Sequence, residues 1–199
     1  MSISGKLPSV CVFCASSLGN RPVYVAAARQ LGEVLARRGI TLVYGGARVG
    51  LMGTVANAVI ENGGRVIGVL PSFLACKEVA HPGLTELRIV GSMHERKALM
   101  AELSAAFISL PGGIGTLEEM MEMISWNQLG VHKKPSGVLN VDGFFEPLLA
   151  QIERGVADGL LWSEHRRMIL VDTSPEGLLQ RLASYEPPDV SRWIRPAQT

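Results

Sequence analysis

Short apolar runs alternate along the chain with segments whose apolar residues recur at helical spacing. The run at residues 10–15 has the length of a buried strand, and residues 22–38 carry Val25, Ala28, Leu31 and Leu35 three or four positions apart. Gly39 ends that helix. The pattern predicts further strands at 40–44, 65–70, 85–90, 106–110, 136–140 and 168–171, an irregular segment at 71–82, and helices at 51–62, 94–103, from the turn at 111–116 to about 128, 145–158 and 175–184.

This alternation predicts an α/β fold. Strands that are apolar on both faces indicate a parallel sheet covered on both sides, so we expect a Rossmann-like three-layer sandwich with a mainly parallel sheet. Ligands bind such sheets at the carboxyl ends of the strands. We expect one Rossmann-like domain over residues 1–186 and a loosely ordered tail over 187–199, which is polar and contains prolines.

Composition and charge narrow the function classes. Among 199 residues the formal net charge is +1, which does not favour a nucleic-acid binder. The sequence has neither an uninterrupted apolar stretch of about 18 residues nor a separate signal-peptide core, so we expect no membrane contact. Three cysteines argue against a disulfide scaffold and favour a cytoplasmic protein. Glycine is enriched, at about 11% against a usual ~7%, and it gathers at 45–53, 63–64 and 112–115.

The glycine turn at 112–115 carries the strongest signal for chemistry. Residues 111–119 read Pro-Gly-Gly-Ile-Gly-Thr-Leu-Glu-Glu, directly after a predicted strand and at the start of a predicted helix. Glycines let the backbone approach a ligand, and a helix N-terminus offers free N–H groups, so the turn predicts a phosphate site to which Thr116 adds a hydroxyl. The alternative is a tight turn in which Thr116 is only the N-cap.

Charged residues flank this turn. Glu118, Glu119 and Glu122 fall on the helix arc opposite Leu117, Met120, Met121 and Ile124, which is typical of a solvated face. Their position beside an anion site favours a second interpretation, in which Glu119 faces a sugar hydroxyl or an attacking water. Arg96 and Lys97 begin another helix at the same sheet edge; they are either a surface charge run or cations that balance a phosphate.

Other familiar motifs fail. No lysine follows the glycines as in a P-loop, and Glu118 stands where a dinucleotide fingerprint needs its third glycine. Cys11 and Cys14 fall in one strand-like run, so we expect buried cysteines. The histidines lack metal-ligand spacing, so no metal is expected. Trp126 and the nearby methionines favour a core or dimer contact.

The chain resembles the LOG ("lonely guy") family, whose members long carried a lysine decarboxylase label. The segment at 111–119 matches the family signature P-G-G-x-G-T-x-x-E, and further blocks follow in the family's order at 10–17, 43–46, 50–53, 93–97 and 139–143. The resemblance covers residues 8–185. Ala15 and Ala47 stand where many members have glycine, and both are small.

The resemblance implies a homodimeric cytokinin riboside 5′-monophosphate phosphoribohydrolase, which releases adenine-type base and ribose 5-phosphate from N6-modified AMP without a cofactor. It assigns catalysis to Arg96 and Glu119. It places substrate contacts at Glu78, Met93, Arg96, Lys97, Gly112, Gly113, Ile114, Gly115, Thr116, Leu117, Glu118 and Ser125. The alternatives are an AMP nucleosidase of purine salvage, a non-catalytic nucleotide-binding module, and a lysine decarboxylase.

Overall fold

The computed structural model describes residues 7–75 and 79–188. Its strands are β1 (Ser9–Phe13), β2 (Thr41–Tyr44), β3 (Val66–Pro71), β4 (Glu86–Val90), β5 (Ala106–Ser109), β6 (Ser136–Leu139) and β7 (Ile169–Asp172). Its helices are α1 (Pro22–Arg37), α2 (Gly50–Glu61), α3 (Ser72–Ala75), α4 (Met93–Glu102), α5 (Ile114–Gln128), α6 (Glu146–Ala157), α7 (Ser163–Arg167) and α8 (Pro175–Ala183), with a 3₁₀ turn at Val141–Gly143.

These elements confirm the predicted order, and their bounds shift by only one or two residues. The exceptions are short. Helix α3 occupies part of the segment that we expected to be irregular, and the pattern missed α7 altogether. Four or five residues are too few to display a helical period, so the apolar pattern holds no signal for either helix.

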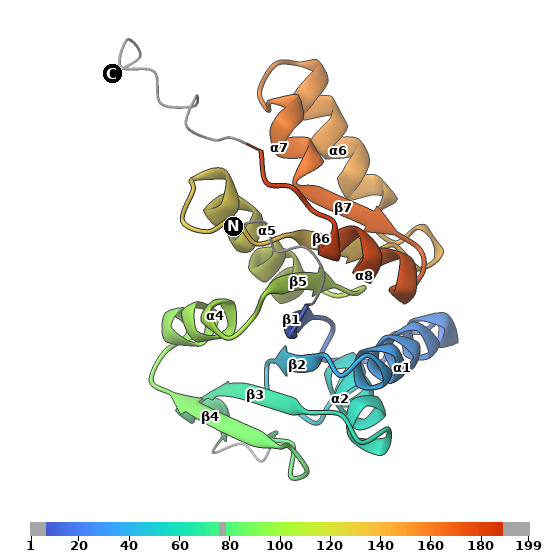
Figure 1. Ribbon diagram of the computed structural model, residues 1–199, viewed down its shortest axis with the longest axis vertical. Helices are drawn as coiled ribbons and strands as arrows, with labels where there is room; N and C mark the ends of the chain where they lie inside the picture. The colour runs from blue at the N-terminus through green and yellow to red at the C-terminus, as the bar shows by residue number, and fades with distance from the viewer. Residues whose placement is uncertain (1–6, 76–78, 189–199) are drawn as a thin grey trace.

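The seven strands form one parallel sheet in the order β4-β3-β2-β1-β5-β6-β7 (Figure 1). The chain builds outward from β1 to β4 on one side and then returns to place β5 on the other side of β1. The topological switch point therefore lies between β1 and β5, where ligands bind in doubly wound sheets. The predicted Rossmann-like sandwich is confirmed.

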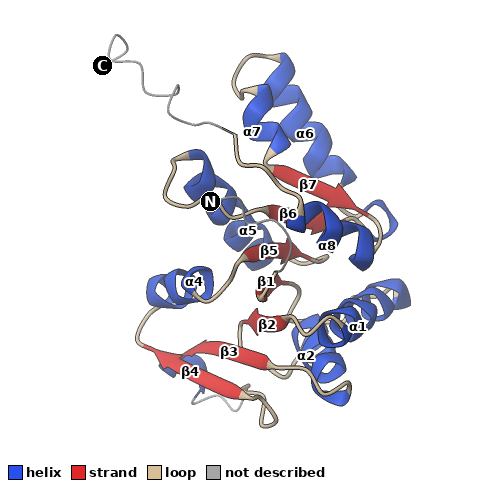
Figure 2. Ribbon diagram, viewed as in Figure 1, coloured by secondary structure: helices blue, strands red, loops and turns tan. Residues whose placement is uncertain are grey.

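Helices cover both faces of the sheet (Figure 2). On one face α1, α2 and α8 pack over Val10 and Val12 of β1. On the other face α4 and α5 pack over Cys11 and Phe13, and α6 joins α5 over β6 and β7. Met120 and Met123 are buried in this second layer, as the core interpretation expects.

The two described cysteines follow this alternation. Cys11 faces the layer of α4 and α5, whereas Cys14 belongs to the cluster under α1 and α2. Both are buried with free thiols, and burial raises the pKa of each thiol. The prediction of buried, unbridged cysteines is therefore confirmed for this pair.

Loops from three strands meet at the carboxyl edge of the sheet. The Ala15 N–H donates to the Pro111 carbonyl at 3.2 Å, and the Leu51 N–H donates to the Ala15 carbonyl at 3.0 Å. These bonds tie the segment after β1 to the glycine turns that follow β2 and β5. Both predicted glycine clusters thus reach one edge, next to the switch point.

No helix in the described residues is both long enough and apolar enough to cross a membrane. Within the same residues, no three His, Cys, Asp or Glu side chains gather closely enough to hold a metal ion.

Candidate active site

The start of α4 fixes the two cations of the site. The Ser92 hydroxyl accepts the Glu95 N–H at 3.1 Å, and the Glu95 carboxylate accepts the Gly91 N–H at 2.7 Å. This reciprocal cap defines where the helix begins. Arg96 and Lys97 follow in its first turns and are both buried, at 8% and 6% exposure. The surface-charge interpretation of these two residues is therefore wrong.

Arg96 is held at three points. Its Nε donates to the Val69 carbonyl of β3 at 3.2 Å, and its Nη1 donates to Glu119 Oε1 of α5 at 3.2 Å. Its guanidinium also lies against Gly45, in the loop after β2, where any Cβ would overlap it. Elements from both sides of the switch point thus converge on one guanidinium.

Glu119 is a buried carboxylate beside this cation. Its side chain is 12% exposed, and the Arg96 side chain 10%. Burial raises the pKa of Glu119, while the Arg96 charge lowers it, and the net pKa lies above the ordinary value. A carboxylate that keeps a cation at hydrogen-bond distance and is shielded from water is placed to meet developing positive charge. The solvated-face interpretation is therefore wrong for Glu119.

Lys97 pairs with the other two acids of α5. Its Nζ donates to Glu118 and lies 3.0 Å from Glu122 Oε2. Burial lowers the pKa of Lys97, but the carboxylates of the two glutamates outweigh burial and leave the pKa raised. The three acids that repel one another in an isolated helix are thus compensated by two cations of α4.

The glycine turn forms the start of α5. Gly113 is the N-cap residue, and no side chain caps the helix. Ile114 at the first helical position is 84% exposed, and a Cβ added at Gly113 or Gly115 would meet no atom within 4 Å. The N–H groups of this first turn therefore lie at an open surface, as the predicted phosphate site requires.

Thr116 does not cap the helix, so that alternative is wrong. It lies inside the first turn and is 4% exposed. Gly112 packs against it so closely that an added Cβ would lie 2.6 Å from the Thr116 Cβ. Gly112 is thus required by packing within the turn, independently of any ligand.

The remaining residues predicted to contact the substrate lie at different distances from the Arg96–Glu119 pair. Met93 begins α4 and is 36% exposed. Leu117 packs its side chain against the apolar cluster between α5 and α6. Ser125 is exposed on α5, seven residues after Glu118 on the same helix face. Glu78 lies outside the described residues. The structure therefore joins Arg96, Lys97, Glu118 and Glu119 directly and leaves Ser125 two turns away.

Comparison with known proteins decides the family. A family described as "Possible lysine decarboxylase" matches residues 52–182. The cytokinin riboside 5′-monophosphate phosphoribohydrolase LOG of Oryza sativa subsp. japonica is 49% identical over 178 residues, which cover 89% of this chain and 74% of that protein. The chain belongs to the LOG family. The resemblance stated from the sequence is thereby confirmed.

Two further similarities extend across this LOG-family chain. The cytokinin riboside 5′-monophosphate phosphoribohydrolase of Rhodococcoides fascians is 49% identical over 177 residues, which cover 88% of the chain and 89% of that protein. A solved structure of a molybdenum cofactor binding protein from Rippkaea orientalis has a TM-score of 0.68 and 25% identity, over 91% of the chain and 98% of that protein.

Sequence reasoning missed two residues of the LOG-family site. Gly45 was noted only as part of a turn, although its missing side chain makes room for Arg96. Glu122 was noted only as a helix acid, although it pairs with Lys97. Its spacing three residues after Glu119 was visible, but the cation on α4 was not, because the packing of α4 beside α5 is a tertiary contact.

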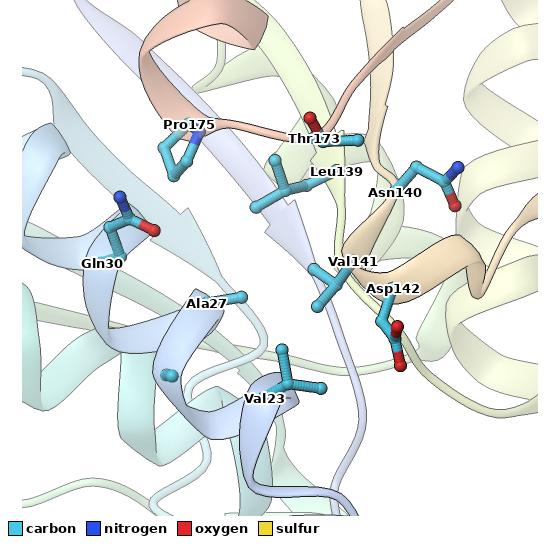
Figure 3. Close-up of a pocket in the computed structure, with 10 residues that line it drawn as sticks. Val23, Ala27, Gln30, Leu139, Asn140, Val141, Asp142, Thr173 and Pro175 are labelled. Carbon is cyan, nitrogen blue, oxygen red and sulfur yellow. The ribbon is translucent and has the colours of Figure 1, made fainter.

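A hollow lies away from this site at the carboxyl edge (Figure 3). It has a volume of about 210 Å³ and lies between α1 and the segments that follow β6 and β7. Asn140 accepts the Phe145 N–H and donates to Glu146, and Asp142 pairs with Arg21 of the loop before α1. Asn140 and Asp142 are thus both engaged in contacts within the protein.

Proposed function

We propose that this chain hydrolyses the N-glycosidic bond of a cytokinin riboside 5′-monophosphate, an N6-modified AMP, and releases the free base and ribose 5-phosphate. The observation that carries this proposal is the buried Arg96–Glu119 pair beside the uncapped, glycine-lined start of α5. The start of α5 suits a phosphate, and the Glu119 carboxylate suits a sugar on which positive charge develops. The names of the relatives support the same reaction.

The phosphate would bind the N–H groups at Gly113, Ile114 and Gly115. A helix N-terminus carries roughly half a positive charge, and the glycines leave the ligand free to approach. This contact is remote from the bond that breaks. Its binding energy is therefore available to fix the ribose in front of Glu119.

Glu119 would act at the anomeric carbon. The bond from C1′ to the base nitrogen breaks, and its electron pair leaves with the base, so positive charge develops on the sugar as in glycoside hydrolysis. Ionised Glu119 stabilises that charge and takes a proton from the water that adds to C1′. The base gains one proton in exchange. Such acid–base help is worth about 10²–10⁴-fold.

Arg96 would act through its charge. A guanidinium has a pKa above about 12 and is a poor proton donor at neutral pH. With one edge on Val69 and Glu119, it keeps the carboxylate ionised and oriented, and its remaining donors are available to the ribose or the departing base. Lys97 would act through the acids of α5, because it pairs with both Glu118 and Glu122.

The decarboxylase label is not favoured by the site lysine. A lysine that binds pyridoxal phosphate attacks as a neutral amine, so enzymes lower its pKa. Lys97 lies between two carboxylates that raise its pKa. Carbon dioxide release from lysine with added pyridoxal phosphate is the assay that would revive this label.

The test is a product assay. Purified protein is incubated with AMP and with isopentenyl-AMP side by side, and the products are separated. We expect free base and ribose 5-phosphate, with Glu119→Gln as the inactive control. A preference for AMP would favour a purine-salvage nucleosidase. Nucleotide binding without turnover would favour the binding module, an alternative consistent with the fold shared with a cofactor-binding protein.

The homodimer, the cytoplasmic location and the boundary between domain and tail stay predictions of the sequence. Light scattering of the purified full chain measures the first. The tail prediction concerns residues 187–199, of which the structure describes the first two.

A further inference from the structure

Lys97 carries two carboxylate partners, one more than its single charge requires. Its side chain is 7% exposed, and its ammonium contacts Glu118 and Glu122 of α5 together. A lysine buried to this degree needs a counter-ion at all times, because an unpaired charge away from water is costly. The excess of one carboxylate therefore requires an explanation.

The two partners differ in what surrounds them. Glu118 is 50% exposed and lies in the first turns of α5, close to the glycine turn. Glu122 lies one turn farther along the helix and is 24% exposed. Its Oε2 is shielded from water and accepts no hydrogen bond of normal geometry, so its contact with Lys97 is an ion pair held by charge. Both carboxylates therefore contact Lys97, but Glu118 is the more exposed of the two and the nearer to the glycine turn.

We propose that Glu122 is a positioning residue that remains the counter-ion of Lys97 while Glu118 turns to a ribose hydroxyl of the substrate. This inference rests on the proposed function. A carboxylate accepts hydrogen bonds from a sugar diol, and Glu118 lies on the side of Glu119 toward the glycine turn. Without Glu122, Lys97 keeps Glu118 as its one partner and withholds it from the ribose.

If Glu122 has this role, its loss weakens the binding of ribose but not the binding of phosphate. The ligands are ribose 5-phosphate and inorganic phosphate, both measured by calorimetry on the full chain, so binding is observed without turnover. For Glu122→Gln we expect the affinity for ribose 5-phosphate to fall about tenfold, the effect of one charge-assisted hydrogen bond. The affinity for inorganic phosphate stays within about twofold or improves, because the variant removes a negative charge from the site.

A double-variant cycle tests whether Glu122 acts through Glu118. Glu118→Gln also weakens ribose 5-phosphate binding. If the inference holds, the double variant Glu118→Gln with Glu122→Gln binds ribose 5-phosphate no more weakly than Glu118→Gln alone. Glu122 acts only by leaving the Glu118 carboxylate free for the ribose, so its loss has no further effect once that carboxylate is gone. In steady-state assays with AMP, Glu122→Gln raises KM about tenfold and leaves kcat within about threefold.

Two results would overturn the inference. One is additive losses in the double variant, and the other is an equal loss of affinity for phosphate and for ribose 5-phosphate. Glu122→Asp keeps the charge but shortens the reach to Lys97; we expect a smaller loss of the same kind, and it replaces Glu122→Gln if that variant unfolds. Glu61→Gln, which breaks an exposed pair with Arg29 on α2, is the matched control and changes neither affinity.

The outcomes also distinguish this inference from the proposed function. Absence of turnover of both AMP and isopentenyl-AMP by the unaltered chain refutes the hydrolase, yet the non-additive loss of ribose 5-phosphate affinity still supports the role of Glu122. Turnover accompanied by additive losses leaves the hydrolase intact and removes this role.

Discussion

Substituting Gly45 with alanine moves Arg96 without touching Arg96 or Glu119. The added Cβ would overlap the Arg96 Nη2 and lie 3.2 Å from its Cζ, and it would also come within 3.3 Å of the Met52 sulfur. The backbone at Gly45 does not have a positive φ, so alanine adopts the same conformation there. The end of the arginine side chain is the part that gives way.

The distance that the Arg96 guanidinium must move determines how much activity Gly45→Ala loses. Carbon and nitrogen atoms in contact lie about 3.5–4 Å apart, so the guanidinium must retreat on the order of 1 Å. Its bonds to the Val69 carbonyl and to Glu119 are both 3.2 Å long, at the upper end of the normal range, and such a shift lengthens at least one of them beyond it. A misplacement of about 1 Å in an active site costs about 10²-fold in rate.

The assay is kcat/KM for AMP hydrolysis, measured with thermal unfolding of the same samples. We expect Gly45→Ala to lose about 10²-fold in kcat/KM while it remains folded. Gly155→Ala is the matched control, because an added Cβ on α6 makes an ordinary 3.6 Å contact with Leu161; it keeps full activity. Full activity in Gly45→Ala would refute the argument that this glycine exists to place the guanidinium.

Three further predictions test the turn, the carboxylate and the cysteines. Gly115→Ala meets open space and improves helix propensity, so Tm rises by about 2 °C while KM for AMP increases at least about tenfold; an unchanged KM would remove the phosphate from this turn. Because burial raises the pKa of Glu119 and its ionised form is the active one, kcat/KM falls as pH drops through a pKa above the ordinary glutamate value; a profile flat down to about pH 4 contradicts this. Cys11 and Cys14 face opposite sides of the sheet, so after air exposure both are alkylated in denaturant without reductant; mass spectrometry showing a bridge between them contradicts the fold.

The fold was predictable because its strands are short, apolar and separated by helices. Two-sided apolar runs such as residues 106–110 have one stable environment, the centre of a parallel sheet, and each was placed to within two residues. The glycine turns then had to reach the carboxyl edge, because each follows a strand. This part of the site followed from connectivity alone, without knowledge of side-chain packing.

The burial of Glu119 was not predictable in the same way. A helical wheel assigns one face to the core and the opposite face to solvent. Helix α5 packs against α4 and α6 as well as the sheet, and its buried residues include the polar Thr116, Glu119 and Asn127. The partner that makes a buried carboxylate tolerable, Arg96, is 23 residues away in the chain. A pattern read within one helix holds no information on such a partner.

The glycines fall into two groups, those that packing within the protein requires and those that it does not. Gly32 and Gly45 lack side chains because the protein fills the space: Ala58 of α2 at Gly32, and the Arg96 guanidinium at Gly45. Gly113 and Gly115 have open space in the Cβ direction, and neither has a positive φ, so nothing within the described protein excludes a side chain there. Glycine early in a helix lowers stability, and such a cost is retained where it serves function. An anion resting on the exposed N–H groups of this turn is a physical reason for both positions, and it connects the glycine content of the sequence to the proposed phosphate site.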